Sequence, residues 1–440
     1  MQVSRRPYRW LVMGLLLFTG LNIFLAFNHH SHGARHSYHG ALWADRAGYF
    51  SYLPASFAHG FRASEFPPGL DTLTGNGFVL DGTTNTLRTK YTSGVAMLQA
   101  PFYLAARAIG VLLGRDYQAY GSLDHAVVLV AGPVYASLAL LLLLRFLGSF
   151  PEWNTSLRSR VFLLFPLFAG SNLFYYAVLD PGMSHVYSFF LFSALLLLWR
   201  SAFYQGGRHF PYPVLTGLVI GLITLIRPTN LIFVASSWFI VGLLSGRPFS
   251  INPIFSDRRG SVLIILAAMV SWVPQMLYWK FTFGSFVVWS YPGEGFTEWT
   301  HPHIAQFLFS TNNGLIPYSP LFLILIAGTI MQWLQGSKWI ATLTLITFGL
   351  ITFLGASWWV WHFGCGYGSR TMVEYLALFA PGLMAFHQWM RHRGYQVHSA
   401  VLLALLVVLQ LKMVYSYGSC WFQGDWNWAA YADLIFGPTK

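Results

Sequence analysis

Residues 125–148 read HAVVLVAGPVYASLALLLLLRFLG, and Arg145 is the only Lys, Arg, Asp or Glu among them. A helix of this length and composition can cross the hydrocarbon core of a bilayer, which takes about 20 apolar residues. The rest of the 440-residue chain has the same character: 55% of its residues are hydrophobic, 9% are charged, and mean hydropathy is +0.51. Soluble domains are about 25% charged, and 18% aromatic residues exclude a disordered chain. The sequence therefore predicts an all-α integral membrane protein.

Apolar stretches bounded by polar loops predict about eleven transmembrane helices in one polytopic domain, residues 1–417, followed by a short tail at 418–440. The apolar runs are long and unbroken, which favours helices over barrel strands. The expected spans are 10–27, 125–148, 161–178, 186–199, 212–226, 229–244, 261–279, 314–333, 339–357, 375–389 and 399–417.

The distribution of basic residues predicts the orientation. Arg5, Arg6 and Arg9 precede the first span and place the N-terminus in the cytoplasm, and most arginines of the later loops then fall on the same side. The net charge of +12 is thus a topology signal rather than a nucleic-acid footprint. We expect a multi-pass protein of the plasma membrane, with loop 28–124 and the C-terminus outside the cytoplasm.

Two stretches decide the span count. Residues 93–113 are apolar enough to span but contain Arg107, and residues 212–244 are interrupted by Arg227 and Pro228. Counting the first as a span, or the second as a single one, would move the arginine-rich loops to the outer side. We therefore expect 93–113 to be a helix at the outer interface and 212–244 to form two helices.

The first outer loop holds an acidic motif, Trp43-Ala-Asp45-Arg46-Ala-Gly-Tyr49. A carboxylate just above the bilayer and among aromatic rings lies in a reduced dielectric, which raises a pKa and suits general-base work. The alternative is that Asp45 caps an interfacial helix. The loop ends in Arg88-Thr-Lys90-Tyr91, where two cations and an aromatic ring can hold a lipid phosphate, or simply snorkel at the interface.

Two further outer loops contribute candidates. The loop at 280–313 contains Glu294, a possible substrate ligand or a solvated loop acid. The loop at 358–374 combines three tryptophans with His362 and Arg370; aromatic faces suit sugars or isoprenoids, and an arginine can clamp a phosphate. An aromatic interfacial belt is the competing interpretation.

Several residues are given structural interpretations. Five histidines between 29 and 39 lack the ligand spacing of a zinc site, so we expect no metal or other cofactor. Asp180 follows the pattern of an Asp-Pro-Gly turn. Cys365 and Cys420 lie on the same predicted side and can pair, although the sequence does not decide this.

The layout resembles the GT-C superfamily of polytopic glycosyltransferases, such as protein O-mannosyltransferases and bacterial aminoarabinose transferase. Members share a first span, a long external loop with an Asp-Glu-x-x-Tyr motif, and further spans. Here Asp45 and Tyr49 are kept, and Arg46 replaces the glutamate. Three later phrases also resemble bacterial members: Arg227-Pro-Thr-Asn230, Pro317-Tyr-Ser-Pro320 and Gly366-Tyr-Gly-Ser-Arg370.

The resemblance implies transfer of a sugar from a polyprenyl-phosphate donor to a saccharide, lipid or protein acceptor, with inversion. Asp45 would act as the general base, and Lys90, with Arg370, would bind the donor phosphate. The remaining expected substrate contacts are Tyr49, Arg88, Tyr91, Glu294 and His362. The alternatives are a transporter or flippase, which would need polar groups at mid-membrane, and a polymerase or ligase for lipid-linked saccharides.

Overall fold

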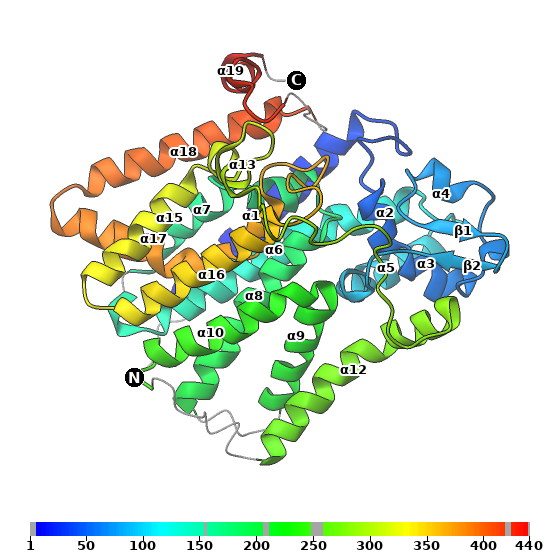
Figure 1. Ribbon diagram of the computed structural model, residues 1–440, viewed down its shortest axis with the longest axis horizontal. Helices are drawn as coiled ribbons and strands as arrows, with labels where there is room; N and C mark the ends of the chain where they lie inside the picture. The colour runs from blue at the N-terminus through cyan, green and yellow to red at the C-terminus, as the bar shows by residue number, and fades with distance from the viewer. Residues whose placement is uncertain (1–5, 154–155, 206–210, 248–257, 419–423, 439–440) are drawn as a thin grey trace. The chain divides into compact units, whose positions relative to one another are not determined.

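The computed structural model describes residues 6–153, 156–205, 211–247, 258–418 and 424–438 (Figure 1). This described part is almost wholly helical, and its only strands are β1 (Val79–Asp81) and β2 (Thr86–Arg88). The two strands pair antiparallel, with Leu80 opposite Leu87. The prediction of an all-α membrane protein is confirmed, and this small hairpin in the first loop is an addition to it.

The α-helices follow the apolar stretches of the sequence, with short helices in the loops between them. They are α1 (Arg6–Ser31), α2 (Asp45–Phe50), α3 (Tyr52–Pro54), α4 (Leu70–Leu73), α5 (Gly94–Leu112), α6 (Ser122–Gly148), α7 (Leu157–Ala169), α8 (Ser184–Gln205), α9 (Tyr212–Ile226), α10 (Leu231–Leu244), α12 (Arg258–Phe283), α13 (Ile304–Phe309), α14 (Leu315–Tyr318), α15 (Leu321–Leu334), α16 (Lys338–Ala356), α17 (Leu376–His392), α18 (Gln396–Ser416) and α19 (Trp428–Phe436).

Seven helices in the described ranges are long and apolar enough to cross a membrane: α1, α5, α6, α8, α12, α16 and α18. Shorter apolar helices include α9, α10 and α15. Residues 212–244 form two helices, because α9 ends at Ile226, Arg227 is extended, and α10 begins at Leu231; that each of them is a separate span stays a prediction. Since α5 is a single helix of 19 residues, its interfacial placement, and with it the orientation of the chain, stays a prediction.

Two predicted spans are not continuous. The span expected at 161–178 ends as α7 at Ala169, and a π-helical turn follows at Tyr175–Leu179. The span expected at 314–333 is divided at Pro320, because a proline ring disfavours helical geometry in the residue before it. Both breaks occur at glycine or proline, which lower the cost of leaving the helix.

The chain packs as two compact units. The first comprises Met1–Ala139, Tyr176–Tyr187 and Pro274–Ser290, and the second comprises Leu140–Tyr175, Ser188–Val273 and Tyr291–Lys440. In the first unit α2 and α3 pack on α5, and β1 contacts α4 (Figure 1). In the second, α15 packs on both α16 and α17, while α18 contacts α7 and α17. That 1–417 is one functional domain stays a prediction.

Candidate functional site

A strained turn places Asp45 at the start of α2. Ala44 holds the N-cap position with φ of 47° and ψ of −120°, a conformation that costs a residue with a Cβ about 1–3 kcal/mol. The N–H of Ala44 donates to the carbonyl of Thr74 at 2.8 Å, and its carbonyl accepts from Gly48. Asp45 is therefore the first residue of α2. Ala44, and not Asp45, occupies the N-cap position.

Asp45, Tyr91, Tyr49 and Lys90 lie together. The hydroxyl of Tyr91 donates a hydrogen bond of 2.5 Å to Oδ1 of Asp45. The ring centres of Tyr91 and Tyr49 are 4.3 Å apart, and Nζ of Lys90 is 5.5 Å from the centre of the Tyr91 ring. The structure thus brings the candidate base, two candidate aromatic contacts and a candidate phosphate cation into one group, which we call the Asp45 cluster.

The glycine of the motif is required by close packing. A Cβ on Gly48 would lie 2.2 Å from the carbonyl oxygen of Gly77 and 2.4 Å from the ring of Tyr91. Neither neighbour can yield cheaply, because one is backbone and the other is a ring that is only 4% exposed. Gly48 therefore allows Tyr91 to approach α2 and reach Asp45.

The segment that carries Lys90 is fixed on both sides. The carbonyl of Lys90 accepts from Ser290 at 2.6 Å, and that of Tyr91 accepts from the hydroxyl of Tyr52 at 2.7 Å. The N–H of Thr89 donates to the hydroxyl of Tyr278 at 2.9 Å. Because the backbone is held at three successive residues, the position from which the Lys90 side chain projects is well defined.

Arg46, which stands where the resembled family has a glutamate, pairs with an acid from a distant loop. Its guanidinium contacts Asp180 at 3.1 Å, and the two side chains are 12% and 9% exposed. Arg46 also donates to the carbonyls of Trp43 and Tyr38 at 3.2 and 3.0 Å. Asp180 is therefore not only a turn residue, because its ion pair with Arg46 connects its loop to the start of α2.

Arg88 is engaged within the β1–β2 hairpin. It contacts Asp81 at 3.0 Å and donates to Thr84 at 3.3 Å. Its guanidinium also lies 5.7 Å from the centre of the Phe283 ring. These contacts give Arg88 a structural role, and the expected role in substrate binding stays untested.

In the second unit, His362 and Arg370 belong to one loop that Asn313 organises. The amide of Asn313 donates to the carbonyls of His362 and Gly364 at 3.2 and 3.1 Å and accepts from the N–H of Gly368 at 3.2 Å. The guanidinium of Arg370 lies 5.8 Å from the centre of the Phe363 ring. Burial lowers the pKa of His362, so the imidazole is neutral at pH 7.

The same loop ends in a partly buried ion pair that the sequence did not single out. Glu374 is fully buried and contacts Arg227 at 3.5 Å, and the next residue, Tyr375, donates to Oδ1 of Asn230 at 3.4 Å. Burial raises the pKa of Glu374 to about 7, against the opposing attraction of Arg227. The only advance signal was that Arg227 begins one of the motifs that resemble bacterial GT-C members, and that Glu374 lies four residues after the end of another.

Glu294 and the histidine-rich segment do not belong to the Asp45 cluster. Glu294 is half-buried, and its N–H donates to the carbonyl of Tyr291 at 3.2 Å. The ring nitrogens of His30 contact the carbonyls of His39 and Leu179 at 2.8 and 3.0 Å, a structural use of the histidine-rich segment. Within the described ranges no group of three or more metal-ligating side chains forms. Cys420 lies outside the described residues, and its pairing with Cys365 stays a prediction.

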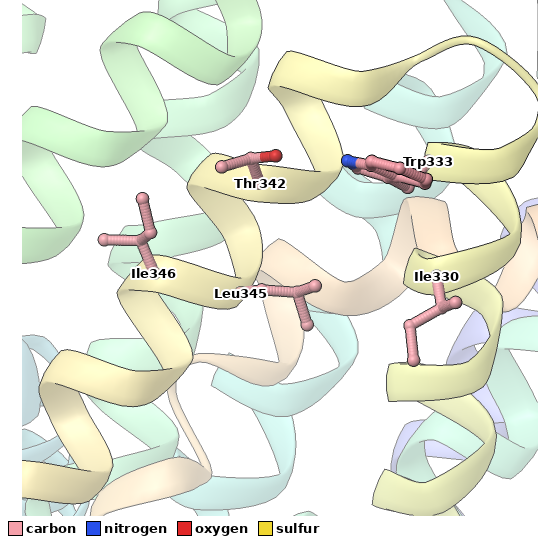
Figure 2. Close-up of a pocket in the computed structure, with 5 residues that line it drawn as sticks. All are labelled: Ile330, Trp333, Thr342, Leu345 and Ile346. Atoms are coloured by element: carbon pink, nitrogen blue, oxygen red, sulfur yellow. The ribbon is translucent and has the colours of Figure 1, made fainter.

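An apolar groove of about 390 Å³ lies on the surface of α15 and α16 (Figure 2). Ile330 and Trp333 line it from α15, and Leu345 and Ile346 line it from α16. It contains no ionisable group, so it offers no chemistry for a reaction.

The comparisons with known proteins give a similarity in fold but no match in sequence. No family model matches the chain, and no curated protein does. Among solved structures the chain is similar to an oligosaccharyltransferase from Archaeoglobus fulgidus, crystallised with Zn and sulfate, with a TM-score of 0.47 and 15% sequence identity. The match covers 97% of this chain and 53% of the other, so the chain spans about half the length of that enzyme. At this identity and TM-score the similarity carries no inference about activity.

Proposed function

We propose that the protein is a membrane glycosyltransferase that transfers a sugar from a polyprenyl-phosphate donor to an acceptor hydroxyl on the extracytoplasmic side. The observation that carries the proposal is the Asp45 cluster, in which the Asp45 carboxylate accepts from the hydroxyl of Tyr91 and the Lys90 ammonium lies over the ring of the same tyrosine. The sequence resemblance to GT-C glycosyltransferases supports the same class of reaction. A base and a phosphate-binding cation are the two groups that such a transfer needs.

In the proposed reaction Asp45 takes the proton of the acceptor hydroxyl. The acceptor oxygen forms a bond to the anomeric carbon as the bond from that carbon to the phosphate oxygen breaks, on the opposite face, so the configuration inverts. Polyprenyl phosphate leaves with the bonding electron pair, and Lys90 stabilises the negative charge that develops. The hydrogen bond from Tyr91 orients Asp45, and Tyr49 supports Tyr91 through its ring.

Arg370 is the second candidate cation for the phosphate, and Glu294 and His362 are proposed contacts of the sugar or acceptor. Their roles rest on the resemblance and on residue type. Each is therefore tested by its own substitution, independently of the Asp45 cluster.

The experiment that tests the donor class compares Lys90→Met with Lys280→Met. Both lysines belong to the first unit and both lie 5.5 Å from an aromatic ring centre, so the pair is matched for charge and for contact with a ring, while Lys90 is half-buried and Lys280 is exposed. Purified protein is incubated with radiolabelled polyprenyl-phosphate hexoses and pentoses and with a membrane extract that supplies acceptor hydroxyls, and both donor binding and the release of polyprenyl phosphate are measured. We expect the parent and Lys280→Met to turn over one donor, and Lys90→Met to lose about tenfold or more in donor affinity, the scale of one charge-assisted contact.

A parent protein that binds no polyprenyl-phosphate sugar would contradict the proposal. Transport of an intact lipid-linked saccharide across vesicles, without cleavage of the phosphate–sugar bond, would favour the flippase alternative instead. Equal loss in Lys90→Met and Lys280→Met would remove Lys90 from the donor site.

A further inference from the structure

A cavity of about 440 Å³ lies where α5 ends and α6 begins, entirely within the first unit. Arg107, Arg115, Tyr117 and Asp124 are among the side chains that line it. A volume of this size is in the range of small-molecule sites. Its lining also differs from that of the groove on α15 and α16, because it combines cations, carboxylates and a phenol.

Arg107 and Arg115 have guanidinium N–H donors available for a ligand. Within the described ranges, the side chains of Arg107 and Arg115 make no hydrogen bond or ion pair with another protein residue. Arg107 is instead held by the ring of Tyr117, whose centre is 3.7 Å from its guanidinium carbon. A guanidinium held by its face keeps its N–H groups available at the edge, the arrangement that binds a phosphate group.

The cavity also presents a buried carboxylate. Asp124 is 2% exposed, and its Oδ2 accepts from the N–H of Tyr120 at 2.8 Å and from the hydroxyl of Tyr117 at 3.2 Å. No described residue donates a hydrogen bond to its Oδ1. With Asp116, the lining carries two carboxylates against two guanidinium groups. A zwitterion matches this balance, whereas a polyanion would meet two like charges.

An apolar rim adjoins the cavity. Val111, Leu112 and Leu113, at the end of α5, are 75%, 84% and 60% exposed, and Val111 also lines the cavity. Three successive apolar side chains at this exposure beside charged groups are typical of a helix end that contacts lipid chains.

From these observations we infer that the cavity between α5 and α6 binds the headgroup of an aminophospholipid. The phosphate would lie against Arg107 and Arg115, the primary ammonium would donate to Asp124, and the acyl chains would lie along Val111, Leu112 and Leu113. This site uses none of the residues of the Asp45 cluster and does not depend on the proposed transfer reaction.

The test measures binding of short-chain lipids to the full-length protein in detergent. The ligands are dihexanoyl phosphatidylethanolamine, the corresponding phosphatidylcholine and phosphatidylglycerol, and free phosphoethanolamine. We expect the phosphatidylethanolamine to bind most tightly, since choline has no N–H to donate and glycerol has no positive charge. Free phosphoethanolamine is expected to bind about tenfold or more weakly than the lipid, because it loses the contact with the apolar rim.

Three variants locate the site. Arg115→Gln, at an exposed position, is expected to weaken phosphatidylethanolamine binding about tenfold, and Arg62→Gln, also exposed but not among the residues that line the cavity, serves as its matched control. Asp124→Asn is expected to abolish the preference for ethanolamine over choline. Equal affinity for all three lipids, or equal affinity of Arg115→Gln and Arg62→Gln, would overturn the inference. Free phosphoethanolamine binding as tightly as the lipid would contradict the assignment to a lipid.

Discussion

Two Arg–Asp pairs of the first unit differ in their surroundings, and this difference determines what each contributes. In the pair of Arg46 and Asp180 the side chains are 12% and 9% exposed, whereas in the pair of Arg88 and Asp81 they are 38% and 18% exposed. An exposed pair is screened by water and contributes little. Removing one partner of a buried pair leaves an uncompensated charge.

We therefore expect Asp180→Asn to destabilise the protein by about 3 kcal/mol and Asp81→Asn to change stability far less. Both substitutions keep the size of the side chain and one acceptor oxygen, so they are matched. The measurement is the midpoint of unfolding in detergent, followed by tryptophan fluorescence. Equal shifts in the two variants would mean that Arg46 and Asp180 do not form a buried pair in the folded protein.

Glu374 predicts a pH dependence of stability. Burial raises its pKa from 4.5 to about 7, so between these values the folded protein holds a proton that the unfolded chain has lost. The stability that the protonated form contributes is complete below about 4.5 and is lost as pH rises through about 7. Glutamine resembles the protonated acid and does not titrate.

The unfolding temperature of Glu374→Gln, relative to the parent, should therefore rise between about pH 5 and pH 8. The comparison of two proteins at each pH cancels the titration of all other groups. A difference that stays constant with pH, or falls, would show that Glu374 is ionised throughout and that its attraction to Arg227 outweighs burial.

At the scale of elements, the glycine in α2 decides whether the Asp45 cluster can form. Gly48→Ala would bring a Cβ within 2.4 Å of the Tyr91 ring, so we expect a loss of about 1–3 kcal/mol, typical of overpacking, together with loss of transfer. Gly82→Ala is the control, because no atom lies within 4 Å of the Cβ it would add. Unfolding and activity assays on both variants check this, and a fully active Gly48→Ala would show that Tyr91 need not approach α2.

Local signals account for what the sequence predicted of the helices and for what it did not. Arg227 and Pro228 interrupt one apolar run with a charge and a proline, and the break between α9 and α10 was predictable from them. Pro166 and Gly170 carry no charge, and hydropathy alone did not reveal that α7 ends at Ala169. The hairpin at 79–88 was not predicted, because its strands have three residues each and β2 has only one apolar residue, which is too little for an alternation of apolar and polar residues to be recognised.

The candidate site was predictable where its residues are close in sequence, and less so where they are not. Asp45 with Tyr49, and Lys90 with Tyr91, were recognisable as two motifs of one loop. That Tyr91 donates to Asp45, and that Arg46 pairs with Asp180, depends on tertiary contacts that leave no local pattern. The positive φ of Ala44 was not predictable either, because alanine seldom adopts that conformation.

At the scale of the whole molecule, the interfacial placement of α5 fixes the orientation of everything after it. We expect an impermeant maleimide applied to intact cells to label Thr83→Cys, in the exposed turn of the hairpin, and not Tyr395→Cys, between α17 and α18. The parent protein, with its two native cysteines, gives the background. If both positions are labelled from outside, the number of crossings between them is even, and the predicted combination of an interfacial α5 with two spans in 212–244 is wrong.

The central claim is that Asp45 removes the proton of the acceptor during sugar transfer. The most direct measurement is transfer by Asp45→Asn from the donor that the parent accepts, with donor binding measured on the same preparation. Asparagine keeps the size of the side chain and an oxygen that can accept from Tyr91, but it cannot take a proton. The account predicts that transfer falls by about 10²–10⁴ while donor affinity is unchanged. Transfer at the parental rate in Asp45→Asn would contradict it.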